Sequence, residues 1–251
     1  MAFQRAYFPM NIIKLGQGYG KKASTHKYSY ALDLSGTYKL FAPFDCKVSK
    51  LYVPKKKKMP DTSHSFEVWL TSTKKVLCAN GYYGYITVSL THPYDISEMK
   101  LGKRFKQFDD LGISTKKMTG TSTGNHCHLE VSKGTSVGWD EKIAKKYGQY
   151  VNKDKVKPEQ YLFVVADGKI TDNEYKGTHY KFIKEKDITY KVKGVKNPPL
   201  LIRDKLLIGK KIGELRNNDD VLLFNDKGYI YHYGILGYTA RKYLSKWLHY
   251  F

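Results

Sequence analysis

The sequence has few cysteines, no long apolar run and few acidic residues. Its three cysteines, Cys46, Cys78 and Cys127, are too few and unsuitably spaced for a disulfide framework or a thiolate zinc site. We therefore expect synthesis in a reducing compartment. No stretch reaches the roughly 18 apolar residues that a membrane-spanning helix needs. Residues 1–9 also lack the apolar core of a secretory signal, so no signal peptide is expected.

The shortage of acidic residues gives the chain a formal net charge of +21, from 44 Lys and Arg against 23 Asp and Glu. Such a charge indicates a polyanionic partner: nucleic acid, a cell wall that carries teichoic acids, or anionic lipid. The excess is spread along the chain, because residues 179–251 contribute +8 and residues 1–178 contribute +13. The lysine run 55–58 is expected to form an exposed loop tip.

Long amphipathic helices are missing as well, and short alternations of apolar and polar residues take their place. Strands are expected at 30–34, 40–43, 46–53, 66–70 and 85–90, and short helices at 141–147 and 158–162. The first stretch, up to about Gly20, is expected to be loop-like because Gly16 and Gly18 are spaced as turns. Many short strands joined by Gly and Pro turns predict an all-β fold.

A composition shift near residues 166–178 marks the expected boundary between two domains. This stretch carries small and turn-forming residues with little to bury, which is typical of a linker. It divides the chain into residues 1–165 and residues 179–251. Beyond it, strand-like pieces recur at 200–203, 212–215, 221–224, 229–233 and 237–240. They predict a small β-barrel.

The stretch Gly120 to Val131 organises the first domain. A Gly/Thr/Ser turn leads into a short strand, in which side chains two residues apart share a face. His126, His128 and Glu130 therefore point to one side, and Leu129 and Val131 to the core. Two imidazoles on one face of a strand are well placed to bind a divalent metal.

Three more residues upstream, His26, Asp33 and His92, are candidates for the same site. Together with the run 122–130, they resemble the lysostaphin-type zinc endopeptidases that cut bacterial peptidoglycan. The stretch from His92 to Gly112 fits that family's segment between its lone histidine and its His-x-His strand. The similarity covers about residues 20–165, and it implies an antiparallel-sheet metallopeptidase domain.

Carried over by position, the resemblance implies that His26, Asp33 and His128 bind Zn²⁺. It makes His92 and His126 the catalytic pair that does not bind the metal. One spacing departs from the family, in which three residues separate the first His from the Asp. Here six residues intervene, and a regular strand would place His26 and Asp33 on opposite faces. We therefore expect a loop or bulge at Lys27–Ser29 to turn His26 back toward the metal.

Structural interpretations remain for several of these residues. His92 falls on the apolar parity of its strand and can be a packing residue, and Asp33 can be a turn or cap residue. Glu130 is expected to support the site through a second contact rather than to bind the metal. Cys127 is expected to fill the core. Surface or packing roles are expected for His64, His179, His232 and His249.

The C-terminal part resembles the bacterial SH3-type wall-binding modules, through the segments 201–203, 212–215 and 237–244. A zinc endopeptidase joined to such a module, without a signal peptide, looks like a bacteriophage endolysin. It would be made in the host cytoplasm and reach the cell wall through a holin pore. A virion-associated lytic protein and a bacterial wall hydrolase exported by another route are the alternatives.

The predicted function is hydrolysis of a peptide bond in the stem or cross-bridge of peptidoglycan. The first rival is a wall-binding protein with an inactive zinc site. The second is a basic nucleic-acid-binding protein, suggested by the charge and by the 22 tyrosines. Stoichiometric zinc and wall lysis would separate the enzyme from DNA binding that falls steeply with salt.

Overall fold

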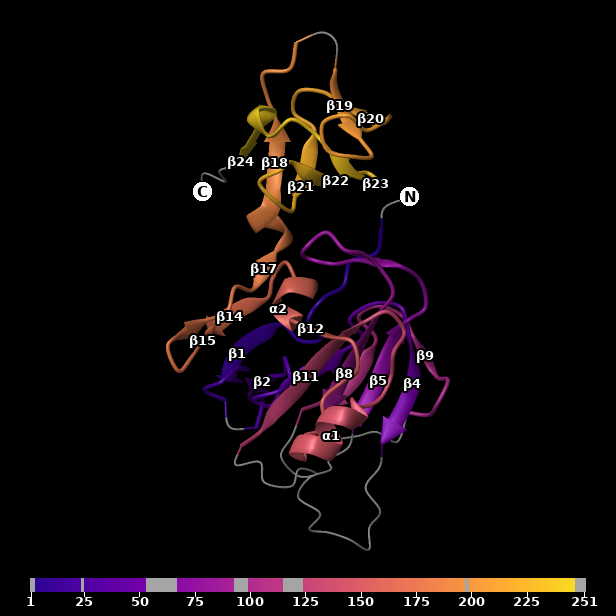
Figure 1. Ribbon diagram of the computed structural model, residues 1–251, viewed down its shortest axis with the longest axis vertical. Helices are drawn as coiled ribbons and strands as arrows, with labels where there is room; N and C mark the ends of the chain where they lie inside the picture. Colours follow the sequence, from indigo (N-terminus) through magenta and orange to yellow (C-terminus); the bar gives the residue numbers. More distant parts are fainter. Residues whose placement is uncertain are drawn as a thin grey trace, which may run out of the picture.

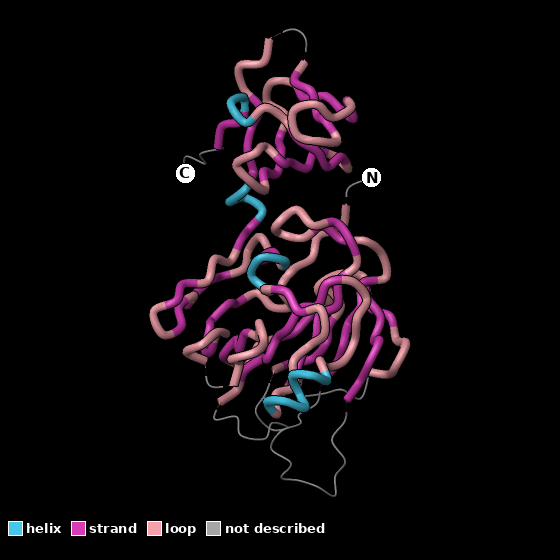
Figure 2. Tube along the Cα trace, in the orientation of Figure 1, coloured by secondary structure: helices cyan, strands magenta, loops and turns pink. Residues whose placement is uncertain are grey.

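The computed structural model describes residues 3–23, 25–52, 67–92, 99–114, 124–196 and 199–246. These residues form mainly β-strands, arranged as a large sheet at one end of the molecule and a smaller sheet at the other (Figure 1). The helical segments among them are short, as Figure 2 shows. The predicted all-β class is confirmed.

The large sheet has nine strands and is antiparallel apart from the β1–β14 pair. In spatial order they are β14 (Lys169–Asp172), β1 (Ile12–Gln17), β2 (Leu32–Ser35), β11 (His126–Lys133), β8 (Ile86–Thr91), β5 (Glu67–Ser72), β4 (Cys46–Tyr52) and β9 (Arg104–Phe105), with β12 (Lys155–Val156) paired to β11. The predicted strands at 30–34, 46–53, 66–70 and 85–90 correspond to β2, β4, β5 and β8.

The two faces of this sheet differ in chemistry. One face packs into a continuous core through aliphatic side chains such as Leu32, Val88 and Leu129, all with no exposed surface. The alternate residues, including Asp33, His128 and Glu130, lie on the other face because successive side chains of a strand point to opposite sides. Cys127 is fully buried in the core, as predicted.

The expectation that the chain is loop-like up to Gly20 is wrong, because β1 occupies Ile12–Gln17 in the large sheet. Ile13 and Leu15 are buried on its core side. Gly16 belongs to this strand rather than to a turn. A Cβ atom at Gly16 would lie 1.9 Å from Oγ of Ser35 on the neighbouring strand. The glycine allows β1 and β2 to approach closely.

The predicted linker has an ordered place in this fold. Its strand β14 pairs with β1 at the edge of the large sheet. Just beyond it, Tyr180 and Phe182 are nearly buried in the first core, where the ring of Phe182 lies 5.4 Å from that of Phe8. The division at residues 166–178 stays a prediction, but the chain remains part of the first core as far as Phe182, and Glu185 still pairs with Arg5.

The smaller sheet has seven strands in the order β20 (Lys211–Leu215), β19 (Leu200–Arg203), β23 (Ile235–Tyr238), β22 (Tyr229–His232), β21 (Asp220–Leu223), β18 (Thr189–Val192) and β24 (Leu244–Lys246). It encloses its own core around Val192, Ile202 and Ile230. It also contacts the first domain, because Phe3 stacks on Tyr83 and packs against Tyr231.

The remaining elements lie outside these two sheets. They are β3 (Lys39–Phe41), β6 (Val76–Leu77), β7 (Tyr83–Gly84), β10 (Asp110–Ile113), α1 (Glu141–Tyr147), α2 (Pro158–Tyr161), β13 (Phe163–Val164), β15 (Glu174–Tyr175), β16 (Thr178–His179), β17 (Ile183–Lys184) and the 3₁₀ helices Glu185–Ile188 and Arg241–Tyr243. The strands among them pair as β3–β10, β6–β7, β13–β17 and β15–β16. No helix of the described segments is long and apolar enough to cross a membrane. The lysine run 55–58, the turn 120–123, His64 and His249 lie outside the described residues.

Candidate metal centre

Asp33 and His128 face each other across two neighbouring strands. The antiparallel pairing of β2 and β11 sets these residues directly opposite one another, on the polar face of the sheet. Nδ1 of His128 lies 3.0 Å from Oδ1 of Asp33. Because the backbone register of a sheet fixes this pair, the two donor atoms keep their spacing without a flexible loop.

His26 reaches the same point from the loop before β2. The chain bends at Lys27–Ser29 and enters β2 only at Leu32, so His26 does not follow the parity of the strand. Its Nε2 lies 3.4 Å from Oδ1 of Asp33, and its ring lies 4.8 Å from that of His128. One donor atom from each of the three residues lies within 4.8 Å of the others.

His92 and His126 form a second pair of rings beside this cluster. Their centroids are 4.5 Å apart and their planes are inclined by 73°. By strand parity alone, the side chain of His92 would point into the core, as that of Leu90 does. The strand β8 ends at Thr91, and His92 has a φ of 76°, in the left-handed region that non-glycine residues seldom occupy. This local backbone turn brings the imidazole to the polar face.

His126 lies on β11 two residues before His128 and therefore on the same face. Its Nδ1 is 3.0 Å from the carbonyl oxygen of Gly124, and its Nε2 is 3.8 Å from Oδ1 of Asp33. If Nδ1 donates to the carbonyl, Nε2 is the nitrogen that faces the cluster. The structure thus brings together all five residues that the sequence singled out.

Burial and charge set opposite protonation states within this group. Burial lowers the pKa of His26 to about 4 and, together with the nearby His126, lowers that of His92 to about 2. Burial alone would also lower the pKa of His128, but its hydrogen bonds to Asp33 and Glu130 raise it to about 10. Burial opposes ionisation of Asp33, yet the neighbouring histidines hold its pKa below the usual range. Positive charge is therefore favoured at His128, between the carboxylates of Asp33 and Glu130, whereas His26 and His92 are neutral.

Glu130 supports His128 from the side away from Asp33. Its Oε1 lies 3.3 Å from Nε2 of His128, and its Oε2 accepts a hydrogen bond from the backbone N–H of Asn152 at 2.9 Å. The side chain of Asn152 bonds in turn to Trp69 and Ser89. Glu130 is thus held in place, and Nδ1 of His128 is left to face Asp33.

Sequence reasoning missed Glu67, which is buried on the same polar face. Its Oε2 accepts a hydrogen bond from Nε1 of Trp139 at 2.9 Å. Burial and the nearby charge of Glu130 raise the pKa of Glu67 to about 8. The signal in the sequence was the alternation along β5, in which Val68 and Leu70 face the core and Glu67 therefore lies on the other side.

The donor set fits zinc. Two imidazole nitrogens and one carboxylate oxygen are the ligand types that Zn²⁺ prefers, and three protein ligands are typical of a catalytic zinc with one open position. The supported Nε2 of His128 adds the outer hydrogen bond that such ligands usually make. His26, Asp33 and His128 are therefore the residues that would hold the metal.

No protein-family model matches the chain. Morphogenesis protein 1 of Bacillus phage B103 is 34% identical over 143 residues, which are 55% of this chain and 35% of that protein. The chain thus spans about a third of the length of this relative.

Solved structures with similar backbones include three peptidases. Lysostaphin from Staphylococcus simulans is 15% identical, with 97% of this chain and 90% of that chain covered and a TM-score of 0.42. A zinc-containing peptidase from Vibrio cholerae is 17% identical, with 51% and 37% covered and a TM-score of 0.34. A putative peptidase M23 from Pseudomonas aeruginosa is 18% identical, with 52% and 49% covered and a TM-score of 0.29. Scores this low carry no functional weight, and the geometry of the site is what indicates its chemistry.

Proposed function

We propose that the protein is a zinc-dependent peptidoglycan endopeptidase. The observation that carries this proposal is the convergence of Nε2 of His26, Oδ1 of Asp33 and Nδ1 of His128. A bound Zn²⁺ would polarise the scissile carbonyl and lower the pKa of a water molecule beside it. His126 and His92 stand next to this point and would exchange protons with the water and the departing amine.

His126 and His92 differ in their hydrogen bonds and in their burial, and they therefore suit different proton transfers. When Nδ1 of His126 donates to the carbonyl of Gly124, Nε2 is the nitrogen that can accept a proton, and it faces Asp33 at 3.8 Å. His92 is nearly buried, and its low pKa favours the neutral ring. A neutral imidazole in a buried place can donate an N–H to an oxygen that gains negative charge.

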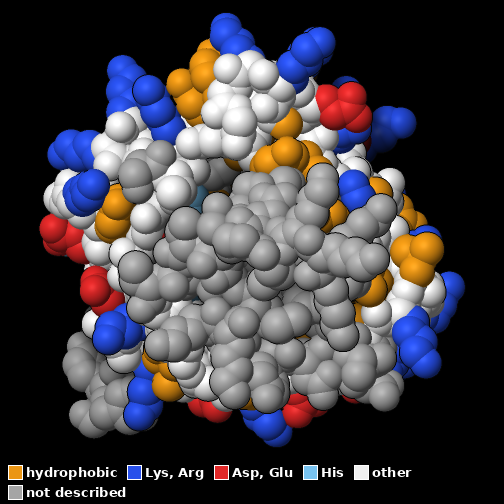
Figure 3. Space-filling model, turned by 90° about the horizontal axis from the view of Figure 1, so that it is seen from below, with side chains coloured by type: hydrophobic (Ala, Val, Ile, Leu, Met, Phe, Trp, Pro, Cys, Tyr) orange, Lys and Arg blue, Asp and Glu red, His pale blue; other side chains and the backbone are white. Residues whose placement is uncertain are grey.

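The C-terminal seven-stranded sheet is proposed to be an SH3-type module that binds the cell wall. The supporting features are its separate core, its strand rhythm and the excess positive charge of residues 179–251. Lys and Arg side chains also surround the opposite end of the molecule, that of the first domain, which Figure 3 shows from below. Anionic wall polymers would be attracted to both parts of the chain, and the affinity should weaken with salt.

The similarity to a phage morphogenesis protein favours a place in a virion over the free endolysin. In this proposal the chain is made in the cytoplasm of a host bacterium and acts on the wall as part of a phage particle. A freely released endolysin and a bacterial autolysin remain the alternatives.

Mass spectrometry of purified peptidoglycan after digestion tests the function. We expect new amino and carboxyl termini within the stem or cross-bridge peptides, and no new termini once a strong chelator has removed the metal. Cleavage of the glycan strands, or full activity without metal, would contradict the proposal. Binding to walls without any release of peptide would favour the inactive wall-binding protein.

A further inference from the structure

The loop between β19 and β20 exposes three consecutive aliphatic side chains. The exposed fractions are 40% for Leu206, 83% for Leu207 and 93% for Ile208. A run of exposed apolar residues gains nothing from folding, because these side chains stay in water. Contiguous apolar surface of this kind marks a place where another apolar surface binds.

Hydrogen bonds hold this loop in a defined shape. Arg203 donates from Nη1 to the carbonyl oxygen of Gly209 at 2.7 Å, which ties the two ends of the loop together. Within the tip, the N–H of Ile208 donates to the carbonyl oxygen of Leu206 at 2.9 Å. Leu207 lies between them with a φ of 68°, in the left-handed region that leucine seldom adopts. The fold therefore presents the apolar tip in a fixed conformation.

Lysines flank the apolar tip on both sides. Lys205 precedes it, and Lys210 and Lys211 follow it, all with exposed side chains. Lys211 is paired with Glu214. Lys205 and Lys210 leave positive charge on either side of the aliphatic residues, and their long side chains can extend from the backbone toward anionic groups.

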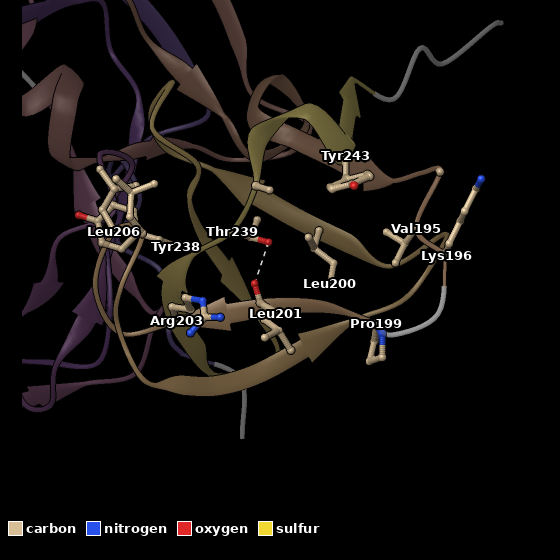
Figure 4. Close-up of a pocket in the computed structure, with 13 residues that line it drawn as sticks. Val195, Lys196, Pro199, Leu200, Leu201, Arg203, Leu206, Tyr238, Thr239 and Tyr243 are labelled. Carbon is tan, nitrogen blue, oxygen red and sulfur yellow. Dashed lines mark hydrogen bonds between the residues drawn. The ribbon is translucent and has the colours of Figure 1, made fainter.

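The apolar surface continues from the tip into the side of the small sheet. Leu206 and Leu207 border a cavity of about 700 Å³, whose other walls include Leu200, Val195 and Tyr243 (Figure 4). The aliphatic side chains of the tip thus adjoin further apolar surface that is not filled by the protein itself.

We propose that residues 206–208 insert into the surface of a bilayer that contains anionic phospholipid. The aliphatic side chains would enter the boundary between headgroups and acyl chains, and Lys205 and Lys210 would contact the phosphates. Other occupants match the tip less well. A second copy would bring the same lysines against each other, and wall glycan offers polar hydroxyls instead of apolar surface. This inference is independent of the zinc chemistry.

Sedimentation of the full-length protein with lipid vesicles tests the proposal. We expect binding to vesicles of phosphatidylcholine and phosphatidylglycerol at physiological salt, and at least about tenfold weaker binding to phosphatidylcholine alone. The double variant Leu207→Ser/Ile208→Ser should lose at least about tenfold in affinity for the anionic vesicles. Leu101→Ser is the matched control, because Leu101 is 73% exposed next to Lys100 in the other domain. It should bind like the unmodified protein.

A fluorescent label distinguishes insertion from attraction by bulk charge. The three native cysteines are buried, so an environment-sensitive dye would attach to the new thiol of Leu207→Cys or Leu101→Cys. Fluorescence of the label at position 207 should rise with anionic vesicles, and that at position 101 should not. Hydrolysis of soluble wall fragments by Leu207→Ser/Ile208→Ser should stay unchanged, so the membrane proposal and the proposed function can fail separately.

Several outcomes would overturn the proposal. Among them are absence of vesicle binding by the unmodified protein, equal binding by the double variant, and equal fluorescence changes at positions 101 and 207. A double variant that alters only the oligomeric state, or only sedimentation with isolated walls, would equally overturn it and assign the tip to self-association or to wall binding.

Discussion

Oε1 of Glu130 lies 3.3 Å from Nε2 of His128, two residues earlier on the same strand face. This contact places the Nε2–H of His128 on a carboxylate and turns Nδ1 toward Asp33. Glu130 is itself anchored by the N–H of Asn152. The orientation of Nδ1, which faces Asp33, therefore depends on a carboxylate that lies on the other side of the imidazole ring.

Glu130→Ala should weaken zinc binding by about 10–100-fold, because His128 loses the partner that fixes its tautomer and ring orientation. Glu130→Gln keeps an acceptor oxygen and should lose less. Competition with a fluorescent zinc chelator measures both affinities. Glu174→Ala is the control, since Glu174 contacts His179 at 3.1 Å on the surface. Zinc affinity of Glu130→Ala equal to that of the control would show that the contact is dispensable.

The purified protein should contain about one equivalent of zinc, and a strong chelator should abolish wall lysis. His128→Ala and Asp33→Ala should each lower the zinc content measured by elemental analysis. His26→Ala should do the same, because its Nε2 lies close to Asp33. If His26→Ala keeps both zinc and activity, the long spacing between His26 and Asp33 means that another residue completes the site.

His92→Ala and His126→Ala should keep nearly stoichiometric zinc and lose at least about a hundredfold in turnover, within the ~10²–10⁴ range for a proton-transfer group. Zinc content and initial rate are measured on the same preparations. A variant that loses its metal would identify that histidine as a ligand. A variant with a normal rate would show that the substituted histidine has only a structural role.

Phe182→Ala should destabilise the first domain by about 3–5 kcal/mol, because it removes a nearly buried ring that packs against Phe8. Chemical denaturation followed by tryptophan fluorescence measures the change. Phe108→Ala is the matched control, since Phe108 is 53% exposed. Equal stability of the two variants would indicate that the first domain ends before Phe182.

Glu67 should make the metal-free protein less stable as the pH rises. Its pKa in the folded state is about 8, above the ordinary value of 4.5, so the folded protein holds a proton that the unfolded chain releases. Between these two values the free energy of unfolding should fall by up to about 1.4 kcal/mol per pH unit. Glu67→Gln should flatten this dependence and be the more stable protein at pH 8. Urea denaturation at pH 5, 6, 7 and 8 compares the two slopes, and identical slopes would contradict the assignment.

The sequence by itself determined which residues share a face of one strand. The alternation of His126, Cys127, His128 and Leu129 predicts two imidazoles on the polar side and two apolar residues in the core, because the side-chain period of a strand is two. Strand β11 has this arrangement. Helix α1 was predictable for a similar local reason, since Asp140 caps its first turn and Gly148 ends it.

Only the tertiary structure decided how distant strands meet. The pairing of His128 with Asp33 joins residues 95 positions apart. Glu130 accepts a hydrogen bond from Asn152, and Glu67 accepts one from Trp139. Strand β1 was misjudged because Gly16 lies within the strand, next to the Ser35 side chain of β2, and not in a turn.

At His92 the sequence pattern also fails to predict the direction of a side chain at the end of a single strand. Strand parity assigned its side chain to the core, but a φ of 76° at the end of β8 redirects it toward His126. Periodicity describes neighbours along one strand, whereas register and local backbone turns are set by packing between segments that the linear pattern does not connect.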